Sequence, residues 1–555
     1  MQKTCANPWC RAPFEILDAD REMAKKFDVE WDPQICSDCR HQHRGMFSAQ
    51  LILHRRKSSL TGKPVISIYS EKKPFPVYAI DEWWSDRWDG IAFGKSFDFG
   101  QAFFSQFREL FFRVPKMANT NENCENCEYT YSAGNAKNAY YSRSIHRSED
   151  VYYSESITGY ARDCIDCLRC QKSSQLWECA QCRDCHLSTF LFRCFLTRDS
   201  HFCFDCRGCS DCIFCWNLRS KSYHIWNKPV SKEEFLKIKA SIIDGKWSTL
   251  QQNLKKWEGI GSNAIWPNLS MVNCEECRGD QLFNSSQCFE CYNCFNSVGN
   301  RYCWELTPSE KCISSMELTR GGIGELLFHC TSLGGGNYFM RMCAQCRLCS
   351  DLTYCIDCYS CRDCFGCTGL RRKRYCVLNE QYSKEEYEAL VRQITDHMKK
   401  SGEWGEFFPL SITPLSYSES VAMNYFPLTK EEVLARGWVW TDPPDIDQEG
   451  LEHRQELPDG IDQVAEDITQ KILFCQKTGR KYKIIPQELQ YYRQLHVPLP
   501  RHHPDVRMQR RRELLNLYKL WKRPCMKCGQ EMETSFSPER PEIVYCETCY
   551  LKAVY

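Results

Sequence analysis

The chain has 555 residues, with 72 Lys and Arg against 71 Asp and Glu and a formal charge of +1. At roughly 100–200 residues per domain, this length predicts several compact units rather than one. The balanced charge excludes a protein that binds polyanions through its bulk charge, and the 43% hydrophobic content excludes wholesale disorder. The unusual feature is the count of 40 cysteines.

The N-terminal residues contain no apolar core of a signal peptide, and no run of 18 apolar residues occurs in the chain. We therefore expect a cytoplasmic protein with no membrane partner. Disulfides are rare in a reducing compartment, so the cysteines are expected to bind metal or to be buried as small apolar side chains.

The first segment, expected over 1–116, opens with two pairs of cysteines. Their spacings are Cys5-x4-Cys10 and Cys36-x2-Cys39. Zinc takes four tetrahedral thiolate or imidazole ligands, and a short turn between two cysteines provides two of them. The spacing predicts a zinc ribbon with the ligands Cys5, Cys10, Cys36 and Cys39.

An aromatic run closes this segment. In FGQAFFSQFRELFFRVP (99–115), Phe103, Phe107 and Leu110 fall on one face at helical spacing. The pattern predicts a core helix that Pro115 terminates.

The cysteine-rich middle repeats with a period of three. Every third position of 164–218 is uncharged, and the same holds for 124–160 in a phase one residue different. Cys exchanges there with Ser, Ala, Thr and Leu, which indicates small buried positions rather than obligatory ligands. Recurrences at nine and eighteen residues predict a coil of about 18 residues stacked on itself, as in a parallel β-solenoid.

The middle is also duplicated. At an offset of 152, LRSKSYHIWNKPVSKEEF (218–235) aligns with LRRKRYCVLNEQYSKEEY (370–387). The Ser-Lys-Glu-Glu run is a helix N-terminal signature, so a capping helix is expected after Ser231 and after Ser383. Two solenoid domains are expected, over 117–257 and 258–400.

Three interpretations of the middle thiols stay open: a ladder of reduced, buried cysteines, zinc or another metal in part of the run, and an iron–sulfur centre. Independent zinc fingers are disfavoured, because neighbouring pairs in CxxCxxCxxC would have to share ligands. The iron–sulfur pattern ends in proline, whereas no proline follows Cys164, Cys167 and Cys170.

Residues 401–470 are Pro-rich and acidic and are expected to form a linker with a small helical element. The last segment, 471–555, is a copy of the first, because an offset of 467 aligns Arg40 with Arg507. Two CxxC pairs at ribbon spacing predict a second zinc site, so about two zinc ions are expected. Its ligands are Cys525, Cys528, Cys546 and Cys549.

Each copy has lost one ribbon site. The positions that match the four C-terminal ligands are Ser58, Thr61, Ala79 and Glu82, so this ribbon is expected to hold by packing alone. In the C-terminal copy, Cys475 and His502 or His503 are left as a broken first site.

A basic helix is expected between the two ribbons of each copy, over 40–57 and 506–523. Arginine clusters suit contacts along a phosphate backbone, and the alternative is a solvated helix face. The candidate nucleic-acid contacts are Arg40, Arg44, Arg55, Arg56, Lys57, Arg507, Arg510, Arg511, Arg512, Lys519, Lys522 and Arg523.

Several motifs together carry a family resemblance: CxNxxC, TGKxxISIYS, WWSDxWD, KxYxxxNxxxSKEE and the closing CxxCGxExxTSFSPERPxIVYCExCYL. The chain resembles the uncharacterised multi-zinc-ribbon, cysteine-rich proteins of small-genome, uncultivated (candidate phyla radiation) bacteria. The resemblance implies zinc at the Cys5 and Cys525 sites. The TGK form at Thr61 departs from the four-cysteine pattern, and no catalytic residues are implied.

The expected fold is mainly β, with zinc ribbons at both ends flanking two β-solenoid-like domains and short capping and linking helices. No phosphate-binding loop, HExxH or nucleophile elbow occurs, so no enzyme activity is expected. The favoured function is a zinc-stabilised scaffold that binds nucleic acid through the basic helices, with RNA as the favoured nucleic acid. The alternatives are a metal- or thiol-handling protein that uses the middle cysteines, and a module that binds other proteins.

Overall fold

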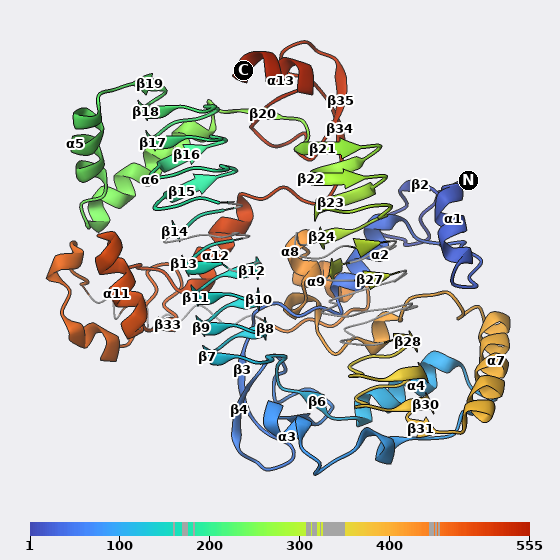
Figure 1. Cartoon of the computed structure of the whole chain (residues 1–555). Helices are drawn as coiled ribbons and strands as arrows, with labels where there is room; N and C mark the ends of the chain where they lie inside the picture. The colour runs from blue at the N-terminus through green and yellow to red at the C-terminus, as the bar shows by residue number, and fades with distance from the viewer. Residues whose placement is uncertain are drawn as a thin grey trace. The chain divides into compact units, whose positions relative to one another are not determined.

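The computed structural model describes residues 1–158, 161–168, 176–180, 184–306, 312–313, 319–321, 324–325, 350–442, 449, 452 and 456–555 (Figure 1). The fold is mixed α/β, with 28% helix and 28% strand, and its sheets are mostly parallel. The expectation of a mainly β protein is wrong, because helix and strand contribute equally.

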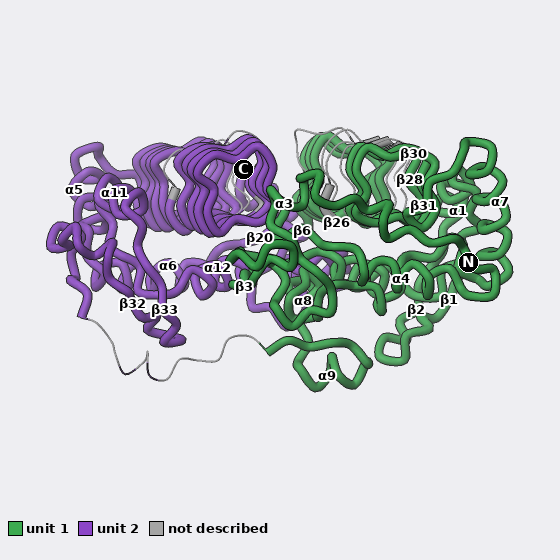
Figure 2. Tube along the Cα trace, turned by 90° about the horizontal axis from the view of Figure 1, so that it is seen from below, with its two compact units in different colours: residues 1–120, 269–442 green, residues 121–268, 443–555 purple. Residues whose placement is uncertain are grey.

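The chain forms two compact units, each built from two separate stretches of sequence (Figure 2). Unit 1 contains residues 1–120 and 269–442, and unit 2 contains residues 121–268 and 443–555. Each unit therefore joins one terminal copy to one cysteine-rich segment. The N-terminal copy belongs with the second segment, and the C-terminal copy belongs with the first.

Short parallel strands form the cysteine-rich segment of unit 2. They are β7 (Glu125–Glu128), β8 (Tyr131–Gly134), β9 (Lys137–Tyr140), β10 (Arg143–His146), β11 (Glu149–Tyr152), β12 (Glu155–Thr158), β13 (Arg162–Ile165), β14 (Leu176–Trp177), β15 (Thr189–Phe192), β16 (His201–Phe204), β17 (Ser210–Ile213) and β18 (Ser222–Ile225). The antiparallel β19 (Lys228–Pro229) ends the sheet.

Paired residues in these strands are twelve apart, as Thr189 and His201 show. The expected coil of about 18 residues is therefore wrong. One step is thirteen residues long, because Glu149 pairs with Arg162, and this extra residue accounts for the change of phase along the sequence.

A left-handed residue at every third position shapes the coil. Asp205, Asp211 and Phe214 have φ values of 45°, 54° and 51°, and each directly precedes a buried cysteine. A regular strand would turn alternate side chains inward. The left-handed residue resets that alternation, so every third side chain is buried and four triplets complete one coil.

The buried thiols form hydrogen bonds along the stack. Cys203 Sγ donates to the carbonyls two residues before it (3.3 Å) and nine residues after it (3.6 Å). Cys194 Sγ accepts from the backbone N–H of Cys206 at 3.4 Å. Ser200 Oγ makes equivalent contacts, accepting from the N–H of Cys212 at 3.1 Å. Serine can therefore replace cysteine in these positions, as the sequence shows.

Unit 1 contains the second set of mostly parallel strands. They are β21 (Met271–Glu275), β22 (Arg278–Ser286), β23 (Phe289–Phe295), β24 (Trp304–Leu306), β25 (Cys312–Ile313), β26 (Thr319–Gly321), β27 (Gly324–Glu325), β28 (Ser350–Thr353), β29 (Arg362–Phe365), β30 (Arg374–Val377) and the antiparallel β31 (Glu380–Gln381).

An asparagine side chain closes each stack in place of a further coil. Asn379 accepts from the backbone N–H of Thr368 at 2.9 Å and donates to its carbonyl at 2.8 Å. Asn227 makes the same pair of contacts with Trp216, both at 3.0 Å. The side-chain amide thus supplies the backbone pairing that the next strand would give.

The two predicted capping helices are confirmed. They are α5 (Lys232–Ile242) and α7 (Lys384–Ser401). Ser231 Oγ accepts from the N–H of Glu234, and Ser383 Oγ accepts from the N–H of Glu386. The aromatic helix is also confirmed as α4 (Phe103–Arg113).

The terminal copies share one order of elements. In the N-terminal copy these are β1 (Gln2–Thr4), β2 (Pro13–Glu15), α1 (Asp18–Lys25), α2 (Ser37–Gly45), β3 (His54–Lys57), β4 (Pro64–Ser67), β5 (Val77–Tyr78) and α3 (Ile80–Trp84). Their counterparts are β32 (Leu473–Phe474), β33 (Lys481–Tyr482), α11 (Pro486–Leu495), α12 (Pro504–Glu513), β34 (Trp521–Pro524), β35 (Glu531–Thr534), β36 (Ile543–Tyr545) and α13 (Glu547–Val554).

The basic helices are shorter than expected. α2 ends at Gly45 and α12 at Glu513, and the residues that follow lead into β3 and β34. A ribbon needs this strand, because it pairs with the next one and brings the following knuckle into place.

The remaining elements connect or cover these parts. They are α6 (Trp247–Gly261), β20 (Ile265–Pro267), β6 (Lys116–Met117), α8 (Ala422–Tyr425), α9 (Lys430–Ala435) and the 3-10 turns Gly90–Phe93, Leu410–Ile412, Tyr417–Glu419, Ile461–Gln463 and Glu466–Gln470. The small helical element expected in the linker is α9. Within the described ranges, no helix combines the length and apolar character that a membrane crossing needs.

Candidate metal centres and the basic helices

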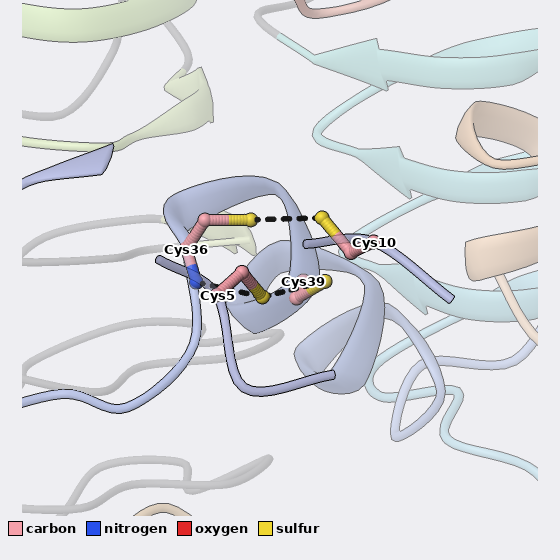
Figure 3. Close-up of side chains that lie close together, drawn as sticks. All are labelled: Cys5, Cys10, Cys36 and Cys39. Atoms are coloured by element: carbon pink, nitrogen blue, oxygen red, sulfur yellow. Dashed lines mark hydrogen bonds between the residues drawn. The ribbon is translucent and has the colours of Figure 1, made fainter. Parts of the chain in front are cut away.

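Four thiols meet in the N-terminal copy (Figure 3). Cys5 Sγ lies 3.7 Å from Cys39 Sγ, and Cys10 Sγ lies 3.6 Å from Cys36 Sγ. All four sulfurs lie within 4.8 Å of one another. Zinc–sulfur bonds of about 2.3 Å in a tetrahedron separate the sulfurs by about 3.8 Å, so the spacing fits this ion.

The start of α2 holds half of this group. Cys36 caps the helix and Cys39 lies in its first turn. The N–H of Cys36 donates to Cys5 Sγ at 3.4 Å. Hydrogen bonding by Cys39 lowers the pKa of Cys36 to about 6, and burial raises the pKa of Cys10 to about 11. The group therefore contains one thiol that is readily available as a thiolate ligand.

The C-terminal copy contains a matching group at the start of α13. Cys528 Sγ lies 3.8 Å from Cys546 Sγ, and all four sulfurs again lie within 4.8 Å. Burial opposes ionisation of Cys525, but backbone N–H groups, that of Cys546 first, lower its pKa to about 6. A hydrogen bond that Cys549 donates to Cys546 raises the pKa of Cys549 to about 12.

Each of these groups could hold a metal ion such as zinc, and both have the ligands predicted from the sequence. In the part of the chain that the structure describes, no other set of three or more Cys, His, Asp or Glu ligands is gathered so closely. The described thiols of the coils therefore do not form a third group of this kind.

In the N-terminal ribbon that lacks the four cysteines, the carboxylate of Glu82 takes the place of the metal site. Ser58 Oγ and Thr61 Oγ1 both donate to Glu82, whose Oε2 also accepts from the N–H of Ala79 at 3.2 Å. Burial opposes ionisation, but these donors keep the pKa of Glu82 below its usual value. The expectation of packing alone is wrong, because hydrogen bonds join the same two loops that four cysteines join in the other copy.

The broken first site of the C-terminal copy keeps a thiol beside an imidazole. Burial would raise the pKa of Cys475, but hydrogen bonds that its sulfur accepts from the His502 side chain and from the backbone of His503 lower it to about 6. Val506 takes the place of Cys39 and offers no ligand atom.

Two arginines of α12 are buried against the coil of the same unit. Arg507 forms an ion pair with Asp166, and Arg511 lies 3.3 Å from the other oxygen of that carboxylate. Both arginine side chains are 2% exposed and Asp166 is fully buried. They are therefore not available to a phosphate backbone in the folded unit, which corrects their assignment as nucleic-acid contacts.

Two neighbouring arginines of α12 also face acids of the coil. Arg510 pairs with Glu178, and Arg512 Nη2 lies 2.6 Å from Glu155 Oε2. Sequence reasoning missed these acids. Asp166 and Glu178 directly precede coil cysteines, and this spacing is the signal that the sequence offered. Both residues have a left-handed backbone.

A tyrosine and a carboxylate complete this contact. The Arg507 guanidinium lies 4.6 Å from the ring centroid of Tyr153. Tyr153 donates to Glu488 of α11 at 2.6 Å, and Tyr492 donates to the other oxygen at 2.7 Å. Burial raises the pKa of Glu488 to about 7 despite the nearby Arg507.

Unit 1 repeats this arrangement. Arg40 lies 5.4 Å from the ring centroid of Tyr302, which donates to Asp20 of α1 at 2.9 Å. Arg44, which aligns with Arg511, is 1% exposed and lies 2.9 Å from His41 Nδ1. Helix α2 therefore turns its arginines inward, as α12 does.

The other candidate basic residues lie on the second hairpins or, for Lys519, just before one. Arg56 is buried and donates to the carbonyl of Ser70, and Arg523 donates to that of Ser537. Those that stay exposed are Arg55, Lys57, Lys519 and Lys522. Nucleic-acid binding by these four residues stays a prediction.

Each four-cysteine group includes the residue that caps a short helix, Cys36 for α2 and Cys546 for α13. The helices with inward-facing arginines, α2 and α12, each pack on the coil of their own unit. No family model matches the chain, and no match is found among curated proteins or solved structures.

Proposed function

We propose that the protein is a non-enzymatic, zinc-stabilised scaffold in which the ribbons lock helices onto β-solenoid-like coils. The supporting observation is common to both units: each thiol group is built on a helix that binds the coil of its own unit. Ser37 of α2 donates to Glu290 at 3.1 Å. Tyr550 of α13 donates to Asp205, which also pairs with Arg219.

The ligand set supports a structural role for the ion. Four cysteines fill the tetrahedron of zinc and leave no position open for water or substrate. Metal binding then contributes its free energy to folding, because the unfolded chain holds no preformed site. The twelve-residue parallel register supports the β-solenoid, in which each coil is stabilised by its neighbours.

The middle cysteines support the scaffold better than metal storage. Their Sγ atoms donate to carbonyls, as Cys212 and Cys364 do at 3.3 and 3.2 Å, and a thiol that donates is protonated. A reduced ladder is therefore part of the proposal.

The test is the zinc content of protein purified anaerobically without a metal-binding tag. We expect two zinc ions per chain, and one in each of Cys39→Ser and Cys549→Ser. Cys203→Ser, a coil control that keeps hydrogen-bonding capacity, should retain two. Stoichiometric iron, or zinc well above two, would contradict the scaffold and favour a metal-handling role.

A second measurement tests the link from metal to coil. Chelation should increase amide exchange in the coil strand that holds Glu290 in unit 1 and in the strand that precedes Asp205 in unit 2. Unchanged exchange in both strands after full zinc removal would show that the ions do not fix the helices to the coils.

A further inference from the structure

Four aromatic rings stack at one corner of the coil in unit 2. Phe190, Phe202, Phe214 and Trp226 are spaced by twelve residues, and successive ring centroids lie 5.0, 5.2 and 4.9 Å apart. Their planes differ by 5°, 22° and 21°. Trp226 ends this ladder, because Asn227 closes the coil directly after it.

The last ring differs from the others in exposure. Phe202 and Phe214 are 1% and 3% exposed, whereas Trp226 is 42% exposed. A large aromatic ring left open at the end of a stack has apolar area to bury and a face suited to another flat ring.

The same place in unit 1 is covered. The offset of 152 matches Trp226 with Leu378, which is fully buried. Leu378 belongs to the buried cluster that contains Phe103 of α4, and its carbonyl accepts from the N–H of Lys95 at 3.2 Å. The segment that follows the N-terminal copy, with α4, therefore covers this corner in unit 1, while the matching corner of unit 2 stays open.

Lysines outnumber acids around the open corner. Residues 212–232 contain no Asp or Glu, and their exposed lysines are Lys221, Lys228 and Lys232. The exposed acids Glu233 and Glu234 follow in the first turn of α5. Lys256 of α6 places Nζ 5.8 Å from the ring centroid of Phe214, next to the end of the ladder. Ammonium groups beside an aromatic platform suit a chain of bases joined by phosphates better than an uncharged or basic partner.

We propose that Trp226 is a stacking platform for a base of single-stranded RNA, with Lys228 and Lys256 facing the phosphates. Every base has a π-face, so the contact would tolerate different sequences. The inference goes beyond the scaffold proposal and does not depend on it, because it needs the folded coil of unit 2 and not a particular metal content.

The test uses the full chain and a fluorescein-labelled oligouridylate of about 12 nucleotides, which is within the length that one such site covers. Anisotropy at low salt gives the Kd. Trp226→Ala should raise the Kd about tenfold, which is the effect of losing one stacked base. Trp226→Phe keeps a ring and should stay near the parent.

Two further variants separate stacking from charge and from folding. Lys228→Glu with Lys256→Glu should flatten the dependence of log Kd on log salt by about 1.4, at about 0.7 per phosphate contact on a single strand. The matched control is Trp84→Ala: Trp84 is 43% exposed, but it meets Trp83 edge-on at 78° and has acidic neighbours. This variant should bind like the parent.

Equal Kd values for Trp226→Ala and the parent would overturn the proposal, and so would an equal loss in Trp84→Ala. A parent protein that binds no oligouridylate at low salt would also overturn it and would leave a protein as the occupant of this corner. The zinc content of Trp226→Ala is measured in parallel. If Trp226→Ala weakens RNA binding while the protein holds fewer than two zinc ions, the result contradicts the scaffold proposal and leaves the proposed stacking role of Trp226 intact.

Discussion

Tyr153 of the coil donates a hydrogen bond of 2.6 Å to Glu488 of the C-terminal copy, although the two residues are 335 positions apart. Glu488 is fully buried, and the charged groups that face it are Arg507 and Asp166. Burial is the largest of these influences, so the carboxyl favours its neutral form in the folded unit.

We expect the stability of unit 2 to fall as pH rises through the titration of Glu488. Its pKa rises from 4.5 to about 7 on folding, so the folded unit holds this proton more tightly than the unfolded chain does. The contribution is complete below about pH 4.5 and is lost above about pH 7, and the change is about 3 kcal/mol. Urea unfolding followed by amide exchange in α11 measures it.

Glu488→Gln should remove this part of the pH dependence, because the amide does not titrate. Glu466→Gln changes an exposed carboxylate and is the control. A slope in Glu488→Gln as steep as in the parent would assign the effect to another group.

Asp166→Asn should destabilise unit 2 strongly. The change leaves Arg507 and Arg511 buried without their carboxylate, and breaking such a buried pair costs about 3–5 kcal/mol. Asp211→Asn, at a half-buried coil position with the same left-handed backbone, should cost much less. Similar losses in denaturant midpoint for both variants would mean that the ion pairs do not hold α12.

A third zinc site should form when the four cysteines of the C-terminal ribbon are placed in the N-terminal copy. The strands match residue for residue, since β3 and β4 pair His54 with Ser67 as β34 and β35 pair Trp521 with Thr534. The change is Ser58→Cys, Thr61→Cys, Ala79→Cys and Glu82→Cys. Elemental analysis should give three zinc ions per chain in place of two.

Glu82→Ala alone tests the present contacts of that ribbon. It leaves Ser58, Thr61 and the N–H of Ala79 without their acceptor, at about 1–3 kcal/mol for each group that stays buried. Faster amide exchange in β3 and β4 is the expected result. Unchanged amide exchange in Glu82→Ala would show that packing holds this ribbon without the carboxylate. A third zinc ion in the four-cysteine variant would then show only that the loops can accept the metal.

The closing asparagines should differ in importance. Asn379 is fully buried and Asn227 is half-buried, although they make the same pair of contacts with the preceding coil. Asn379 also donates to the carbonyl of Gly90 at 3.0 Å. Asn379→Ala leaves the N–H and carbonyl of Thr368 unpaired inside unit 1, at about 1–3 kcal/mol per group. Asn227→Ala should cost less, because water can replace the amide. Thermal melting of the two variants measures the difference, and a larger loss for Asn227→Ala would contradict the burial argument.

Local chemistry made the metal groups predictable from sequence. Cys525 and Cys528 are three residues apart, and a ribbon needs them on one turn wherever the rest of the chain goes. The triplet pattern likewise predicted which coil positions are buried, because burial of a small side chain depends on its own residue type.

The coil length was not predictable, because it depends on backbone conformation. The left-handed positions are occupied by residues such as Asp205 and Phe214, and only occasionally by glycine, so no residue type marks them. The pairing of Arg507 with Asp166 was not predictable either. It links positions 341 apart and depends on which terminal copy packs on which segment.

The division of the chain has a consequence for its synthesis. Residues 1–120 leave the ribosome before their partner segment, which begins at residue 269. At about 5–20 residues per second, the N-terminal copy waits about 8–30 seconds before the first strand of its coil is available. Until then its inward-facing apolar surface is exposed, so a nascent chain is the form of this protein most in need of a chaperone.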